Sequence, residues 1–219
     1  MQILNGCSIS VDRGQVVVIV GPNGAGKSTA MKALLGIVPL TSGDITLDGK
    51  SLGGMDPQSR VKRGIAFVPQ TDNIFPTMTV LENLKMGAYL RRDDIGASIE
   101  EVFETFPILR TKRGDLGRTL SGGQRQQLAV GRALMSRPTV LMLDEPTAGV
   151  SPNVAADLLQ QIVALKERGL ALLMVEQNAR QALEIADVGY VLVLGENRYT
   201  GSGQDLLADH EVRRSFLGG

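Results

Sequence analysis

The stretch VVVIVGPNGAGKST, residues 16–29, decides the fold. Its first five residues are all β-branched and predict a buried parallel strand. A glycine-rich turn follows at once, and the residues from about 27 to 36 predict a helix. A buried strand that passes through a tight turn into a helix is typical of an α/β protein.

The turn GPNGAGKST fits the pattern G-x-x-x-x-G-K-[ST]. Its glycines let backbone N–H groups surround an anion without Cβ clashes, and the helix N-terminus adds partial positive charge. Lys27 can reach the β- and γ-phosphates of a nucleotide, and the Ser28 hydroxyl can bind Mg²⁺. We therefore expect a nucleotide phosphate site made of Gly21, Pro22, Asn23, Gly24, Ala25, Gly26, Lys27, Ser28 and Thr29.

Two further strands also end in polar residues. The stretch VLMLDEPT, residues 140–147, places Asp144 where it can hold Mg²⁺ through water. Glu145 would lie near the γ-phosphate, where a carboxylate can orient or deprotonate the attacking water. The stretch LALLMVEQNA, residues 170–179, ends in Glu176, Gln177 and Asn178. Ligands bind beyond the carboxyl ends of parallel strands, so we expect this polar cluster to face the ligand.

The remaining pattern predicts strands that alternate with helices around a helical insert. Ile3, Cys7, Ile9 and Val11 fall on one face and predict a half-exposed antiparallel strand. Strand signals vanish from about residue 71 to 138. Helices are expected near 27–36, 79–91, 98–106, 121–136, 153–168 and 179–186, and further strands near 44–47, 65–68, 140–143, 170–175 and 188–194.

The composition narrows the class of protein. The chain has 219 residues, 43% of them hydrophobic, so it can bury a core. Its 23 basic and 23 acidic residues balance, which argues against a nucleic-acid partner. The single cysteine, Cys7, excludes an internal disulfide. The apolar runs are shorter than the ~20 residues of a membrane helix, so any work at a membrane requires docking on another protein.

The stretch LSGGQRQQ, residues 120–127, predicts a second anion site. Ser121 can cap a helix, and Gly122 and Gly123 would leave its first N–H groups open. Two phosphate sites for one nucleotide are hard to explain in one monomer. The arrangement makes sense if the second site closes on a nucleotide that a partner holds.

With these motifs in place, the chain resembles an ABC-type ATPase cassette. The order and spacing of Gly21–Thr29, Gln70 in VPQ, Leu120–Gln124 and Leu141–Glu145 carry the resemblance. It implies an α/β fold of the P-loop NTPase type: a RecA-like core with a parallel sheet, an N-terminal antiparallel β part and an inserted α-helical subdomain. It divides one ABC ATPase domain, 1–219, into a catalytic core (1–70 and 137–219) and a helical signature subdomain (71–136).

The resemblance also implies how ATP is handled. Two cassettes, alike or different, pair head to tail, and each ATP lies between one cassette's phosphate loop and the other's Ser121, Gly122, Gly123 and Gln124. Gln70 contacts Mg²⁺, with Ser28 and Asp144 as the other metal residues. Lys27 and Glu145 are catalytic.

Three longer stretches resemble the cassettes of branched-chain amino acid importers and their amide and urea relatives: FPTMTVLENLKMGAY (75–89), VEQNARQALEIADVGYVL (175–192) and EVRRSFLGG (211–219). The implied partners are transmembrane permease subunits and, indirectly, a solute-binding protein, with the chain peripheral on the cytoplasmic face of the cell membrane. Two other classes stay open: an ABC ATPase that serves no transporter, and a regulatory subunit that hydrolyses little.

The chain departs from the family pattern at three places. Gln177 stands where a histidine usually contacts the γ-phosphate, and we expect its amide to donate there; the one histidine, His210, is expected at the surface. Ser151 replaces an aspartate that communicates across the dimer. The first aromatic residue is Phe67, so no ring precedes the phosphate loop to stack on adenine. The missing stacking contact should weaken ATP binding by ~0.5–1.5 kcal/mol. We therefore expect this chain to bind ATP weakly unless the native chain is longer at its N-terminus.

Six apolar residues of the insert could form a docking surface for a membrane partner, or could pack the insert's own core: Phe75, Met78, Val80, Leu84, Met86 and Tyr89.

Overall fold

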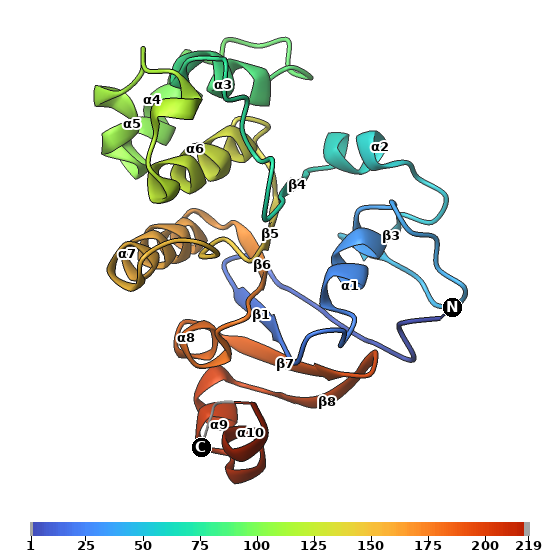
Figure 1. The fold of residues 1–219 in the computed structure, drawn as a ribbon. Helices are drawn as coiled ribbons and strands as arrows, with labels where there is room; N and C mark the ends of the chain where they lie inside the picture. The colour runs from blue at the N-terminus through green and yellow to red at the C-terminus, as the bar shows by residue number, and fades with distance from the viewer. Residues whose placement is uncertain (1, 217–219) are drawn as a thin grey trace.

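A mixed sheet forms the centre of the computed structural model, which describes residues 2–216 (Figure 1). Its strand order is β4-β5-β6-β1-β7-β8. The strands are β1 (Val16–Val20), β4 (Ile65–Val68), β5 (Val140–Asp144), β6 (Ala171–Val175), β7 (Val188–Val193) and β8 (Glu196–Gly201). A separate antiparallel pair joins β2 (Thr46–Leu47) to β3 (Lys50–Ser51).

Helices pack on both faces of this sheet (Figure 1). The α-helices are α1 (Lys27–Leu34), α2 (Pro57–Lys62), α3 (Val80–Gly87), α4 (Gly96–Thr105), α5 (Pro107–Thr111), α6 (Gly122–Leu134), α7 (Pro152–Val163), α8 (Ala179–Glu184), α9 (Gly203–Ala208) and α10 (His210–Phe216). Two 3₁₀ helices, η1 (Gly117–Thr119) and η2 (Ala164–Arg168), complete the list.

The parallel register brings the ends of the first five strands in the sheet to one edge. Val17 of β1 lies opposite Leu173 of β6 and Val188 of β7, and Val68 of β4 lies opposite Leu143 of β5. β8 alone runs antiparallel, beside β7. Loops that leave the carboxyl ends of β4, β5, β6 and β1 therefore lie side by side, which is the usual place for a ligand in such a sheet.

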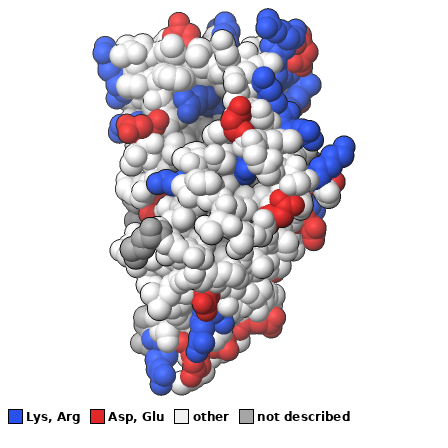
Figure 2. Space-filling view, turned by 90° about the vertical axis from the view of Figure 1, so that its right-hand side faces the viewer, with Lys and Arg blue, Asp and Glu red and all other residues white. Residues whose placement is uncertain are grey.

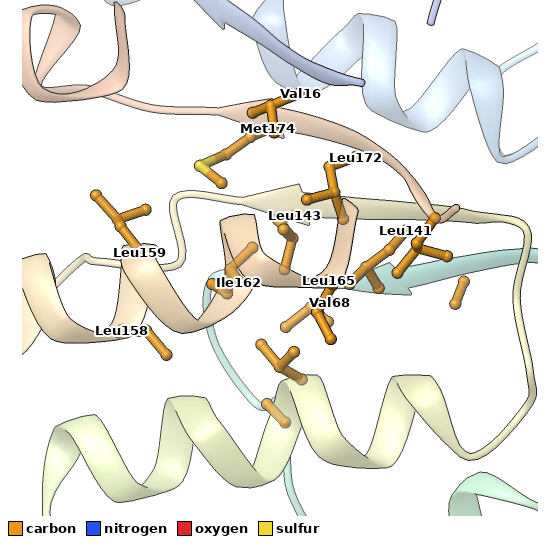
Figure 3. Close-up of a cluster of buried hydrophobic side chains, with 14 of the residues drawn as sticks. Val16, Val68, Leu141, Leu143, Leu158, Leu159, Ile162, Leu165, Leu172 and Met174 are labelled. Atoms are coloured by element: carbon orange, nitrogen blue, oxygen red, sulfur yellow. The ribbon is translucent and has the colours of Figure 1, made fainter. Parts of the chain in front are cut away.

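Strand β1 is buried on both faces, which explains its uninterrupted β-branched sequence. Val16, Val18 and Val20 face a cluster shared with α6, α7 and α8, whereas Val17 and Ile19 face a cluster shared with α1. Figure 3 shows part of the larger cluster, in which Leu159 and Ile162 of α7 point toward side chains from the sheet. The core thus fixes the strand that carries the phosphate loop.

The segment between β4 and β5, all of it described, holds α3 to α6 and η1 and no strand. These helices gather at one end of the molecule (Figure 1). The expected helices near 79–91, 98–106 and 121–136 correspond to α3, α4 and α6 within a few residues. α5, α2, α9, α10, β3 and β8 were not expected, because their apolar patterns are short.

The predicted strand over residues 3–11 is wrong: residues 2–15 form no strand. The N–H groups of Ser8 and Ser10 donate to side chains, Asn197 Oδ1 (3.1 Å) and the Tyr190 hydroxyl (3.2 Å), rather than to a neighbouring strand. The alternating pattern instead reflects packing, because Leu4, Cys7, Ile9 and Val11 rest on the smaller core cluster. Ile3, expected on that face, is 43% exposed.

Within residues 2–216 no helix has the length and apolarity needed to cross a membrane. On the face shown in Figure 2, basic and acidic side chains concentrate toward the two ends, and the middle is mostly uncharged. His210 is exposed, as expected. Part of the 211–219 stretch, residues 217–219, lies outside the described residues.

A buried arginine closes the end of α1, the helix that starts in the phosphate loop. Arg60 of α2 is 5% exposed, and its guanidinium donates to the carbonyls of Ala33 (3.0 Å) and Leu34 (2.7 Å) at the end of α1. It also donates to Leu52 O (3.1 Å) and Met55 O (3.2 Å). A cation is favourable at a helix C-terminus, and here it also satisfies carbonyls that have few other donors.

We expect Arg60→Leu to lower the free energy of unfolding by about 2–4 kcal/mol, since the substitution removes the donor to Leu34 O and Met55 O and leaves Ala33 O and Leu52 O with one backbone donor each. Urea unfolding measures the loss. Arg63→Leu is the matched control. Arg63 follows α2 directly and is exposed, so its substitution should change the free energy of unfolding by less than about 0.5 kcal/mol. Equal effects of the two substitutions would contradict this account.

Candidate functional site

Four neighbouring strand ends bring most of the expected site residues together. The phosphate loop follows β1, Asp144 is the last residue of β5, and Gln70 and Gln177 lie two residues beyond β4 and β6. β4, β5, β6 and β1 are consecutive in the sheet. These residues are up to 156 positions apart in sequence, and the parallel order of the strands places them along one edge.

The phosphate loop requires glycine for two distinct reasons. Gly21, Gly24 and Gly26 have φ values of 148°, 79° and 103°, which side chains other than glycine rarely adopt. A Cβ at Gly21 would also lie 2.2 Å from the Leu192 carbonyl oxygen of β7. Gly26 is the N-cap residue of α1 and has no side chain to cap the helix. The first N–H groups of α1 are therefore free of a side-chain cap and can donate to an anion.

Lys27 is folded back onto its own loop. Its Nζ donates to the carbonyls of Gly21 (2.8 Å) and Pro22 (3.1 Å), and the residue is 6% exposed. Burial lowers the pKa of Lys27, while the negative charges of Glu145 and Asp144 act to raise it. A buried ammonium that donates, among residues 2–216, to loop carbonyls alone is suited to receive phosphate oxygens in their place.

Asp144 and Glu145 form an acidic pair opposite Lys27. Burial, and then repulsion from Glu145, raise the pKa of Asp144; Lys32 and Lys27 act against this shift. Glu145 has a φ of 46°, in the left-handed region. Its Oε2 accepts a hydrogen bond of 2.7 Å from Gln70 Nε2. A cation bound between these two carboxylates and the phosphates would stabilise the ionised form of both carboxylates.

The oxygen ligands at this site suit Mg²⁺, which also takes waters and phosphates as ligands, better than they suit a metal that protein side chains hold alone. Residues 2–216 contain no group of three or more His, Cys, Asp or Glu side chains that could hold a metal. Mg²⁺ is commonly held by one or two carboxylates together with waters and substrate phosphates. Asp144, the exposed hydroxyl of Ser28 and the exposed amide of Gln70 supply such a partial set.

The three polar residues after β6 line one cavity, but two of them also form hydrogen bonds within the protein. Glu176 is 3% exposed, and its Oε1 accepts from Thr147 N (3.2 Å) and Thr147 Oγ1 (2.9 Å). Asn178 caps α8 by accepting from Gln181 N (3.2 Å). Gln177 and Asn178 are both exposed, and all three residues line a 350 Å³ cavity with Glu145.

The second predicted anion site has the expected helix cap. Ser121 Oγ accepts from Gln124 N (3.3 Å), and Gln124 Oε1 accepts from Ser121 N (3.0 Å). This capping box leaves the N–H groups of Gly122 and Gly123 for another acceptor. No hydrogen bond found among the described residues joins this segment to the phosphate loop of the same chain.

The two glycines of this segment have different surroundings. A Cβ at Gly122 would meet only Gly149 O, at 3.5 Å, whereas one at Gly123 would lie 2.4 Å from Val154 Cγ1 of α7. Gly123 therefore also permits close packing of α6 on α7, a role that the sequence did not indicate. Ser151, the N-cap residue of α7, is exposed and makes no side-chain cap.

Two buried polar pairs were missed by the sequence analysis. One is the Thr147–Glu176 pair. In the other, Asn73 Nδ2 donates to Pro69 O (3.2 Å) and Gln126 Oε1 (2.8 Å), and so ties the loop of Gln70 to α6. No local sequence signal identifies such pairs, because each joins residues that are far apart in the chain.

Comparison with known proteins agrees with this geometry. The family model for the ABC transporter matches residues 4–148. The high-affinity branched-chain amino acid transport ATP-binding protein BraG of Pseudomonas aeruginosa is 40% identical over 220 residues, covering 100% of this chain and 94% of BraG. The lipopolysaccharide export system ATP-binding protein LptB of Haemophilus influenzae is 34% identical, covering 99% and 91%.

A solved structure shows the same fold. The ADP conformation of MJ1267, an ATP-binding cassette of an ABC transporter, superposes with a TM-score of 0.89 at 30% identity, covering 99% of this chain and 93% of that one. The chain therefore belongs to the ABC transporter family, as an ATP-binding subunit with a P-loop NTPase fold. It is an ATPase.

We expect Gly123→Ala to destabilise the protein by about 1–3 kcal/mol, because the new methyl group overlaps Val154. Thermal unfolding of the purified chain measures this. Val154→Ala in the same chain should restore most of the loss, and Gly122→Ala should leave the unfolding midpoint nearly unchanged. Full stability of Gly123→Ala on its own would show that α6 and α7 do not constrain this residue.

Proposed function

We propose that this chain energises the import of a branched-chain amino acid or a related small solute, such as an amide or urea. The observation that carries the proposal is the similarity to BraG along the whole chain, together with the chemistry gathered at the edge of the sheet. LptB, named for lipopolysaccharide export, is also similar to this chain. The similarity therefore supports ATPase chemistry for both substrates, and the identity of the transported solute needs its own test.

In the proposed hydrolysis, different residues bind the phosphates, hold the metal ion and activate the water. Lys27 exchanges its bonds to Gly21 O and Pro22 O for bonds to the β- and γ-phosphates. Ser28, Gln70 and Asp144 would hold Mg²⁺, which neutralises phosphate charge when bound. Glu145 orients the attacking water and accepts its proton as the bond from the γ-phosphorus to the bridging oxygen breaks, which yields ADP and phosphate.

Gln177 completes the phosphate site in this proposal. It is exposed beside Glu145 in the 350 Å³ cavity, and its amide can donate to the γ-phosphate without titrating near neutral pH. The remaining loop residues, Pro22, Asn23, Gly24, Ala25, Gly26 and Thr29, surround the phosphates with backbone N–H groups.

A second cassette, identical or different, supplies the other half of the ATP site. The capping box at Ser121 leaves the N–H groups of Gly122 and Gly123 without an acceptor from the cap, and these groups would meet the γ-phosphate held by the partner's phosphate loop. The division into a catalytic core (1–70 and 137–219) and a helical signature subdomain (71–136) then assigns each half of the ATP site to a different unit.

The helical subdomain offers an apolar surface for permease subunits. Phe75, Met86 and Tyr89 are 40%, 40% and 77% exposed, whereas Val80 and Leu84 are fully buried in the subdomain. Arg132 lies over the Phe75 ring at 4.9 Å, and Asn83 holds the Phe75 backbone through both its N–H (2.8 Å) and its carbonyl (3.0 Å). Docking of permease subunits on this surface would hold the chain on the cytoplasmic face of the cell membrane. A solute-binding protein would act on the opposite side of that membrane.

We expect Gln177→Ala to lower the steady-state ATPase rate at least about tenfold, because a phosphate donor is lost. Gln177→His should retain most of the rate, since a histidine can also donate. Asn178→Ala is the control from the same cavity: the Asn178 side chain accepts from Gln181 N to cap α8, so we expect its loss to change the rate much less than Gln177→Ala does. The same rate for Gln177→Ala and the unmodified protein would remove Gln177 from the site.

Co-purification with its permease subunits and reconstitution into vesicles tests the transport proposal. We expect ATP-dependent uptake of leucine, isoleucine or valine, or of a small amide, when the solute-binding protein is present. Tyr89→Ala should lower transport while leaving the ATPase rate of the isolated chain intact, since Tyr89 is 77% exposed on the proposed docking surface. ATP-dependent movement of a lipid, with no uptake of these solutes, would overturn the importer assignment.

A further inference from the structure

Glu176 lies where three neighbouring strands end. Its backbone N–H donates to Ile19 O of β1 (3.3 Å), just ahead of the phosphate loop. The carbonyl of the preceding residue, Val175, accepts from Glu145 N (2.9 Å). The next residue is Gln177. The backbone at residues 175–176 is therefore linked to the strand that leads into the phosphate loop and to Glu145, and it continues directly into Gln177.

The side chain of Glu176 makes a second link between the same loops. It is buried at 3% exposure and accepts both the N–H (3.2 Å) and the hydroxyl (2.9 Å) of Thr147, two residues beyond Glu145. Burial raises the pKa of Glu176, and the bonds from Thr147 act to lower it. A carboxylate removed from water costs free energy, so a simple strand end would not be expected to keep one there.

The loop that Thr147 belongs to has an unusual backbone. Glu145 adopts a left-handed φ of 46°, which costs a non-glycine residue free energy and persists only when the surroundings hold it. A tight turn follows, in which Ala148 N donates to Glu145 O (3.0 Å) and Val150 N donates to Thr147 O (3.2 Å). The two bonds from Thr147 to Glu176 fasten this turn to the end of β6.

We propose that the Thr147–Glu176 pair is a positioning clamp for ATP hydrolysis. It holds the turn that carries Glu145 against the residue that precedes Gln177, and all four side chains line the same 350 Å³ cavity. Glu176 and Thr147 act through Glu145 and Gln177, so the proposal rests on the roles proposed for those two residues. Loss of the clamp should misplace the water relative to the γ-phosphate while leaving nucleotide affinity intact.

Steady-state ATPase kinetics of the whole chain test the clamp. Thr147→Val keeps the shape of the side chain but removes the hydroxyl, and we expect kcat to fall about tenfold while KM for ATP changes less than about twofold. Thr147→Ser restores the donor and should restore kcat. Glu176→Gln should retain most of the rate, because its amide oxygen can accept both bonds.

Thr139→Val is the matched control. Thr139 is a half-buried threonine at the other end of β5, and its hydroxyl donates to Gly64 O at 3.3 Å. It should leave kcat unchanged while losing one threonine hydroxyl hydrogen bond, to a backbone carbonyl. If Thr147→Val does not fold, Thr147→Ala takes its place, with Thr139→Ala as the control.

The unfolding midpoint of each variant distinguishes positioning from stability. A fall in kcat for Thr147→Val beyond that of Thr139→Val, at similar unfolding midpoints, supports the clamp. An unchanged kcat, or a loss that Thr147→Ser does not restore, overturns it. Glu145→Gln and Gln177→Ala, measured alongside, separate the two levels: if they abolish hydrolysis while Thr147→Val does not, the clamp alone fails, and if they have no effect, the proposed roles of Glu145 and Gln177 fail.

Discussion

Parallel pairing of β1 with β6, and of β6 with β5, is the constraint on which the site depends. It places the end of β1, where the phosphate loop begins, beside the strand ends that carry Glu145 and Gln177. Because β1 is buried on both faces, its position is fixed by packing rather than by the loop itself. The glycines then allow the backbone to turn sharply where Leu192 O of β7 leaves no room for a side chain.

Charge at the site is unbalanced in a way that suits a nucleotide with a divalent cation. Lys27 is buried with only carbonyl partners, and Asp144 and Glu145 repel each other nearby. Each of these arrangements is costly in the protein alone, since buried charges lose their hydration. Phosphate oxygens would relieve the lysine, and a cation would relieve the acids. The site thus gives up stability in the free protein for affinity and chemistry when the ligands bind.

Most of the α/β core followed from the sequence, because its strands are short apolar runs bounded by glycine or acidic residues. Val16–Val20 and Ile65–Val68 were predicted to the residue. The opening segment was not, since an alternating pattern reports which side chains are buried and not whether the backbone pairs with a strand. Likewise, the capping box at Ser121 was visible locally, but the contact of Gly123 with Val154 required the packing of two helices.

The sequence by itself determined the phosphate loop, the acidic pair, the signature segment and the family, because each depends on residues that are neighbours in the chain. The tertiary structure alone decided how the three polar residues after β6 divide their roles. All three line the cavity beside Glu145, but Glu176 is buried and accepts from Thr147, Asn178 caps a helix, and Gln177 is exposed. The physical reason is that burial and hydrogen-bond partners come from strands β1 and β5, which the local sequence of 176–178 does not contain.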